Sequence, residues 1–124
     1  MGMYTGLRGT IVLKREYLDK FSNELESEDG FCWENILPSD NKFYNYNRNL
    51  FIPNGLVCWM PYDWDNFEEG KLDGNSFTFC CSLKNHCGTI EVFLEHCLPL
   101  IADKWKLEEL YEEDEVPTQH VNWY

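Results

Sequence analysis

The sequence has few basic residues and no long apolar run. Lys and Arg number 10 against 22 Asp and Glu, which gives a formal net charge of −12 at pH 7. Because binding to nucleic acid phosphates and to anionic lipid depends on Lys and Arg, we predict no direct nucleic acid binding and no membrane binding. No stretch approaches the roughly eighteen apolar residues of a membrane span, and the N-terminus lacks a signal sequence, which predicts a cytoplasmic protein.

The sequence also lacks the short motifs that identify common catalytic and cofactor sites. It contains no C-x-x-C pair, no phosphate-binding glycine-rich loop, no G-x-S-x-G and no H-E-x-x-H. His86 precedes Cys87 and His96 precedes Cys97, but adjacent side chains seldom face each other as a nucleophile and its base must. The stretch "DWDNFEEG" has Phe67 where a calcium loop needs a third oxygen ligand. We therefore predict a protein that is not an enzyme and that has neither a cofactor nor a metal site.

What the sequence does contain predicts one folded domain. A chain of 124 residues with 16% aromatic residues can bury a single core without metals or disulfides. We assign residues 1–116 to a single α+β domain and residues 117–124 to a C-terminal tail. Apolar periodicity predicts strands at 5–13, 55–60, 76–85 and 104–111 and helices at 14–27 and 89–101.

The order of these elements predicts the arrangement of the sheet. The simplest fold for the order strand, helix, strand, strand, helix, strand is a ferredoxin-like antiparallel sheet, βαββαβ, with two helices on one face. Residues 31–53 form a long insertion rich in aromatic residues and Asn, which we expect to be an ordered loop with Trp33 and Ile36 packed at its start. We expect Thr89 to cap the second helix, and Gly30 to follow the end of the first in a left-handed conformation.

Carboxylates gather in three regions, at residues 24–29, 63–69 and 108–115. A charge run alone is usually a solvated face, but these regions are interleaved with aromatic residues, and protein interfaces use aromatic anchors within a polar rim. The predicted partner-binding residues are Asp63, Trp64, Asp65, Phe67, Glu68, Glu69, Tyr111, Glu112, Glu113, Asp114 and Glu115. A basic protein, such as a nuclease or nucleic-acid-binding effector, would be attracted to this surface, which predicts a non-enzymatic inhibitor.

An alternative function follows from the stretch "KFYNYNRNLF" at residues 42–51. Aromatic side chains interleaved with amides can stack on a base and hydrogen-bond to its edges. Phe43, Tyr44, Tyr46 and Arg48 are then the candidate residues for binding a small nucleotide-like ligand. The same aromatic residues could instead anchor the loop to the domain, and a small enzyme with an unrecognised site is a third alternative.

Three stretches, "MYTGLRGTIVLKREY", "FTFCCSLKNHCGTIEVFLEHCLPLI" and "LEELYEEDEVPT", cover roughly half of the chain. In these stretches the sequence resembles small uncharacterised proteins carried by bacteria and their phages. In its acidic, aromatic-rich composition it also resembles immunity proteins of bacterial toxins and phage-encoded inhibitors of host defence. The second resemblance implies that the chain neutralises a protein target by binding it.

Overall fold

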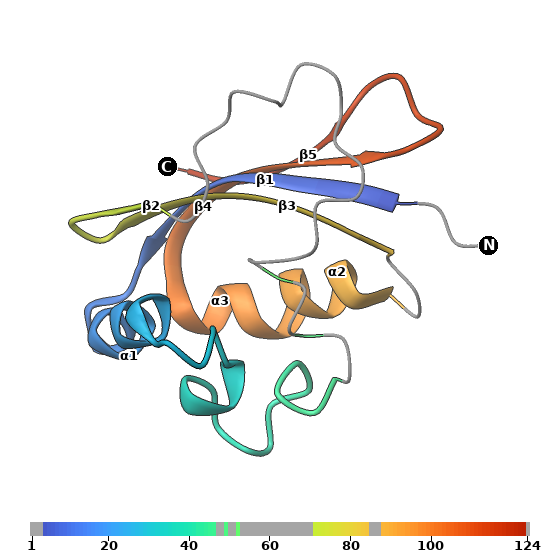
Figure 1. Ribbon diagram of the computed structural model, residues 1–124. Coiled ribbons are helices and arrows are strands. Elements are labelled where there is room, and N and C mark those ends of the chain that lie inside the picture. The colour runs from blue at the N-terminus through green and yellow to red at the C-terminus, as the bar shows by residue number, and fades with distance from the viewer. Residues whose placement is uncertain (1–3, 47–48, 50–51, 53–70, 85–87, 124) are drawn as a thin grey trace.

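The structure, a computed structural model, describes residues 4–46, 49, 52, 71–84 and 88–123 (Figure 1). The strands are β1 (Tyr4–Leu13), β2 (Lys71–Asp73), β3 (Ser76–Lys84), β4 (Ala102–Tyr111) and β5 (Thr118–Asn122). The helical segments are α1 (Arg15–Glu26), the short 3₁₀ turn η1 (Trp33–Asn35), and a continuous run of α2 (Thr89–Val92), η5 (Phe93–Cys97) and α3 (Leu98–Ile101). The predicted strand at 55–60 lies outside the described residues.

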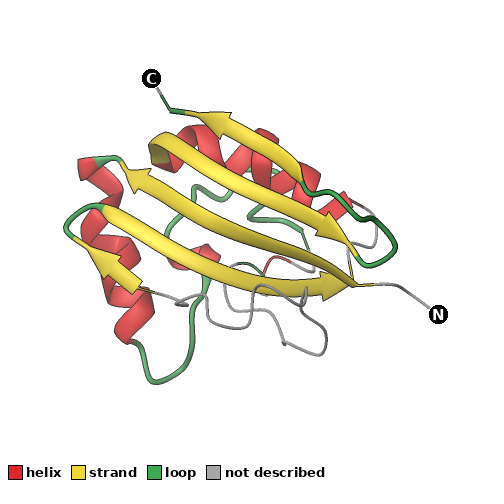
Figure 2. Ribbon diagram, turned by 90° about the horizontal axis from the view of Figure 1, so that it is seen from above, coloured by secondary structure: helices red, strands yellow, loops and turns green. Residues whose placement is uncertain are grey.

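The strands form one antiparallel sheet in the order β2-β3-β1-β4-β5 (Figure 2). The prediction of an α+β fold with an antiparallel sheet and two helices is confirmed. The prediction of a ferredoxin-like βαββαβ sheet is wrong, because the sheet has a fifth strand, β5, which pairs with the side of β4 that would be an edge in that fold. This strand comes from residues 118–122 of the predicted C-terminal tail, which pair with residues 105–109 of β4.

Strand β1 lies at the centre of the sheet and shows the predicted alternation. Leu7, Ile11 and Leu13 are buried on the face that the helices cover, the lower side of the sheet in Figure 1, while Arg8 and Thr10 on the other face are only half-buried. Strand β3 buries its predicted apolar residues on that same face, namely Phe77, Phe79, Cys81 and Leu83. The helix-facing side of the central strands is therefore the wall of the core.

Helix α1 and the run from α2 to α3 cover the same face of the sheet (Figure 1). Gly88, with φ +74°, is the residue before the second helix, so Thr89 is its first residue and not its cap as predicted. The middle of this run, η5, is a π-helix that ends at Cys97, two residues before Pro99. Proline has no N–H to donate, so a departure from α-helical hydrogen bonding is expected next to it.

The segment after α1 packs against the helices and completes the core. Trp33 and Ile36 are both buried, as predicted. Asn41 organises the following turns: its side-chain oxygen accepts hydrogen bonds from the N–H groups of Phe43 (2.8 Å) and Tyr44 (3.2 Å), and its amide nitrogen donates to the carbonyl of His96 at 2.8 Å. Such Asn side-chain bonds replace regular secondary structure, which explains an ordered loop in an Asn-rich segment.

Within the described residues, no helix combines the length and apolar character needed to cross a lipid bilayer.

Candidate functional site

The acidic run predicted as part of a partner surface lies at the tip of a β-hairpin. Strand β4 ends at Tyr111 and β5 begins at Thr118, and the residues between them connect the two strands. The N–H of Glu112 donates to the carbonyl of Tyr4 at 3.0 Å, and the N–H of Asp114 donates to the carbonyl of Tyr111 at 2.9 Å. These bonds hold the backbone of the connection, so the carboxylates project from a defined turn.

The carboxylates of this turn are available to a partner. Glu113, Asp114 and Glu115 are exposed, and Glu112 is half-buried. None of the four side chains makes a hydrogen bond or an ion pair with a described residue. Four successive acidic side chains repel one another, and a basic partner would relieve that repulsion.

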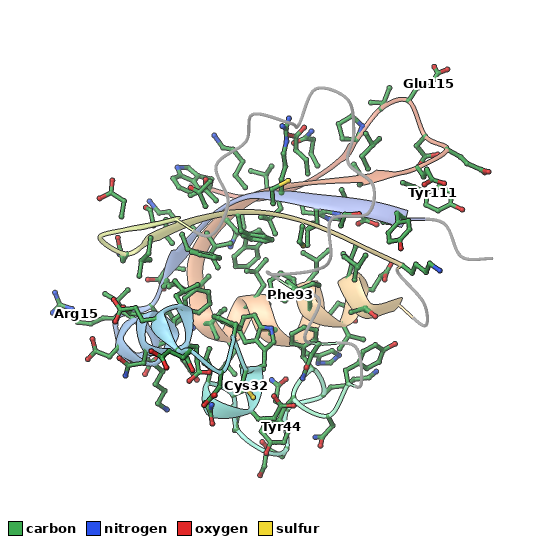
Figure 3. The ribbon with its side chains drawn as sticks, in the orientation of Figure 1. Arg15, Cys32, Tyr44, Phe93, Tyr111 and Glu115 are labelled. Carbon is green, nitrogen blue, oxygen red and sulfur yellow. The ribbon has the colours of Figure 1, made fainter. Side chains whose placement is uncertain are left out.

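Exposed apolar side chains gather on the same hairpin. Among the described residues, the large hydrophobic side chains that are exposed are Tyr111 (37%), Val116 (76%), Val121 (49%) and Trp123 (39%). Tyr111 and Val116 flank the carboxylates, and we call residues 111–116 the hairpin tip; Figure 3 shows Tyr111 and Glu115 together there. The tip thus combines exposed apolar side chains with carboxylates that have no ion-pair partner among the described residues.

The body of the hairpin, in contrast, satisfies its own charges. Arg8 Nε donates to Glu108 Oε1 at 2.9 Å, and Gln119 Nε2 donates to Glu108 Oε2 at 3.1 Å, so that one carboxylate links β1, β4 and β5. On the opposite face of the sheet His120 Nε2 lies 2.9 Å from Glu109 Oε1. Paired and half-buried, these carboxylates stabilise the hairpin and are less accessible to a partner than those of the tip.

The far end of the hairpin has the opposite charge. Lys104 Nζ and Lys106 Nζ lie 5.9 Å and 5.5 Å from the centre of the Trp123 ring. These distances are within the range of cation–π attraction. Strand β5 is an edge of the sheet, because β4 is its only neighbour among the described strands. The hairpin therefore presents an acidic tip at one end and lysines at the other.

The other half of the predicted partner surface is not placed by the structure. Asp63, Trp64, Asp65, Phe67, Glu68 and Glu69 lie outside the described residues, as does Arg48 of the alternative ligand site.

The alternative site falls on a cavity at the opposite side of the molecule. Tyr44 and Tyr46 line a cavity of about 520 Å³, and Figure 3 shows Tyr44 and Cys32 beyond the helices from the hairpin tip. The residues that line it are Phe31, Cys32, Glu34, Tyr44, Asn45, Tyr46 and Asn49. The contributions of residues 31–34 were missed from the sequence, because no local pattern indicates that they meet the Asn-rich segment.

Phe43 of the same segment belongs to the core and not to the cavity wall. Its side chain is fully buried, and its ring centre lies 5.6 Å from that of Trp33 and 5.4 Å from that of Phe93. Both pairs are edge-to-face, the arrangement that aromatic quadrupoles favour. Phe43 thus anchors the loop, while the two tyrosines beside it face the cavity.

A thiol and a carboxylate interact in the cavity wall. Cys32 Sγ donates to Glu34 Oε2 at 3.0 Å. This bond lowers the pKa of Glu34, assisted by a hydrogen bond from Asn49, so Glu34 is ionised at neutral pH. The same bond, together with partial burial, raises the pKa of Cys32. The lining residues that the structure describes therefore supply one carboxylate and no Lys or Arg.

Replacing Glu34 by glutamine should make Cys32 more reactive. Loss of the carboxylate lowers the pKa of the thiol, and the thiolate fraction rises roughly tenfold for each unit by which that pKa falls. The rate of Cys32 alkylation near neutral pH, measured by peptide mass spectrometry, should increase several-fold. Cys97 is the internal control, because its burial raises its pKa well above the usual value and should keep it unreactive in both proteins. An unchanged Cys32 rate would show that the carboxylate does not govern this thiol.

No three His, Cys, Asp or Glu side chains of the described ranges come together as a metal site requires.

Searches of protein-family models, of curated proteins and of solved structures each returned no match to this chain.

Proposed function

We propose that this protein is a non-enzymatic protein-binding module that inhibits a basic target, as phage anti-defence proteins and toxin-immunity proteins do. The observation that carries the proposal is the hairpin tip, where Tyr111 and Val116 flank carboxylates that make no hydrogen bond or ion pair with the part of the chain that the structure describes. Interfaces obtain affinity from desolvated apolar anchors and obtain orientation and association rate from surrounding charge. The target is a nuclease or another nucleic-acid-binding effector, whose basic groove would accept the acidic tip in place of phosphates.

The polarity of the hairpin supports a single orientation of the partner. The tip carries exposed carboxylates, and Lys104 and Lys106 lie toward the other end of β4. A basic surface is attracted to the first end and repelled by the second, so electrostatic steering favours binding at the tip. The hydrogen bonds that hold the turn reduce the entropy that binding would otherwise cost.

Charge reversal at the tip tests the proposal. The variant Glu113→Lys, Asp114→Lys, Glu115→Lys should lose a basic partner that the unaltered protein captures from host lysate at low salt and releases at high salt. The thermal midpoint should hardly change, because these side chains are exposed and make no hydrogen bond or ion pair with a described residue. The measurement is quantitative mass spectrometry of the captured proteins at both salt concentrations.

A matched variant separates a local effect from one of net charge. Glu26, Glu28 and Asp29 are exposed carboxylates after the end of α1 or in its last turn, and replacing all three by lysine changes the net charge by the same amount. This control should retain the partner. The hairpin interface would be refuted if the tip variant still captured the basic partner, or if both variants lost it equally. The interface would then be sought at residues 63–69.

A further inference from the structure

The cavity on the far side of the helices is lined by aromatic side chains that take no part in the proposed hairpin interface. Three aromatic side chains, Phe31, Tyr44 and Tyr46, contribute to its wall, and each is half-buried because part of it packs on the core. Phe31 is fixed by edge-to-face contacts with Phe21 and Trp33, at centroid distances of 5.0 Å and 4.9 Å. The wall is thus built on rings that the core holds in place.

Hydrogen bonds also fix the loop that carries the two tyrosines. Asn49 is buried, and its amide nitrogen donates to the carbonyls of Phe43 at 3.1 Å and Tyr44 at 3.2 Å. The amide nitrogen of Asn45 donates to the carbonyls of Ser39 at 2.9 Å and Asn41 at 3.0 Å, which leaves its oxygen as an acceptor. A site whose backbone is fixed before the ligand arrives loses little conformational entropy on binding.

The charge of the wall restricts the ligand. Glu34 is ionised and is exposed at the cavity, and Glu24 lies nearby, because its Oε1 accepts hydrogen bonds from the N–H of Cys32 at 3.1 Å and from Asn35 Nδ2 at 3.2 Å. A phosphate would be repelled by these carboxylates and by the net charge of −12. A cation would be attracted to them, and it would also be attracted to the negative faces of aromatic rings.

We infer that this cavity binds a compact organic cation, a quaternary or protonated amine, with its charged head between the Tyr44 and Tyr46 rings and the Glu34 carboxylate. The volume of about 520 Å³ is in the range of small-molecule sites. The inference is independent of the hairpin interface, which lies on the opposite side of the molecule (Figure 3). Among the described lining residues the charged group is the Glu34 carboxylate, so this cavity favours a cation over the phosphate of the nucleotide-like ligand expected from the sequence, and the aromatic recognition is kept.

Calorimetric titration with choline tests this inference. Choline should bind, and its neutral carbon analogue, in which a tert-butyl group replaces the trimethylammonium group, should bind at least about tenfold more weakly, since the two have the same shape and differ in charge. Glu34→Gln should weaken choline binding by about tenfold, and Tyr46→Ala should weaken it by a similar factor. Thermal melting of each variant establishes that it is folded, and Tyr46→Phe, which retains the ring, should bind as the unaltered protein does.

Two control variants show whether a change in choline binding arises from the cavity itself. Glu28→Gln removes one exposed carboxylate that does not line the cavity, and it should leave choline binding unchanged. The charge-reversed hairpin tip should also bind choline normally, so this site and the partner interface can fail separately. Equal binding of choline and its neutral analogue, tighter binding of adenosine monophosphate than of choline, or no binding of choline would each overturn the inference.

Discussion

Replacing Gly9 by alanine should destabilise the protein by about 4 kcal/mol and leave little folded chain at physiological temperature. Gly9 lies at the centre of β1, opposite Phe79 of β3 and Leu107 of β4. A Cβ atom there would lie 2.1 Å from the carbonyl oxygen of Lys106 and 2.8 Å from the Cα of Leu107, which are backbone atoms that cannot move aside alone. The backbone also has φ +149°, which L side chains rarely adopt, so the two central strands would have to separate.

Gly30 provides the matched control for this prediction. It also has a positive φ, +95°, but nothing lies within 4 Å of the Cβ that alanine would add. Gly30→Ala should therefore cost only the backbone strain, about 1 kcal/mol. Urea unfolding followed by circular dichroism compares the two variants. If Gly9→Ala were as stable as Gly30→Ala, the close approach of β1 and β4 would not be a requirement of the fold.

Replacing Trp33 by alanine should cost about 3–5 kcal/mol of unfolding free energy. Trp33 is buried, and its ring lies among those of Phe21, Phe31, Phe43 and Phe93, with centroid distances from 4.9 Å to 6.0 Å. Truncation would leave a cavity lined by these rings, and the loss of packing contacts adds to the loss of buried apolar area. It would also remove the hydrogen bond from Trp33 Nε1 to the carbonyl of Ile52.

Two further substitutions identify the source of this cost. Trp33→Phe retains a ring but loses the hydrogen bond, so the loss should be intermediate. Trp123→Ala removes an indole that is 39% exposed, and it should change stability by less than about 1 kcal/mol. The measurement is again the free energy of unfolding in urea. An equal loss for Trp33→Ala and Trp123→Ala would contradict the assignment of Trp33 to the centre of the core.

The position of Trp33 also links the core to the cavity. Its neighbour Cys32 and the nearby Glu34 line the cavity, whereas the Trp33 ring packs beneath them. The 3₁₀ turn Trp33–Asn35 therefore places an anchor on one side and polar groups on the other. Variants of Trp33 are therefore unsuitable for tests of ligand binding, because they destabilise the fold. Glu34 and Tyr46 are suitable, because Glu34 is exposed and Tyr46 is half-buried.

The sequence alone was sufficient for the elements whose pattern follows from burial on one face. Alternation located β1, β3 and β4, because a strand with one face on the core must alternate apolar and polar residues. Spacing of three and four located α1 and the helical run that begins at Thr89 for the same reason, with the helical period. Asp73 ends β2 and is followed by Gly74 at φ +63° in the turn to β3, and Asp-Gly is a typical turn sequence.

Only the tertiary structure decided the features that depend on distant partners. Thr118–Asn122 has little apolar pattern of its own and becomes β5 because β4 offers it an edge to pair with, which also turns the acidic run into a hairpin tip. Phe43 and Tyr44 are adjacent and both aromatic, yet one fills the core and the other lines a cavity, since Asn41 and Asn49 set the turn between them. Composition predicted an acidic, aromatic surface. The structure shows that Glu108 and Glu109 are paired with side chains distant in the sequence, whereas Glu113, Asp114 and Glu115 have no such partners among the described residues. Local pattern records which face of an element is buried, whereas the neighbours of a side chain are set by how the elements pack together.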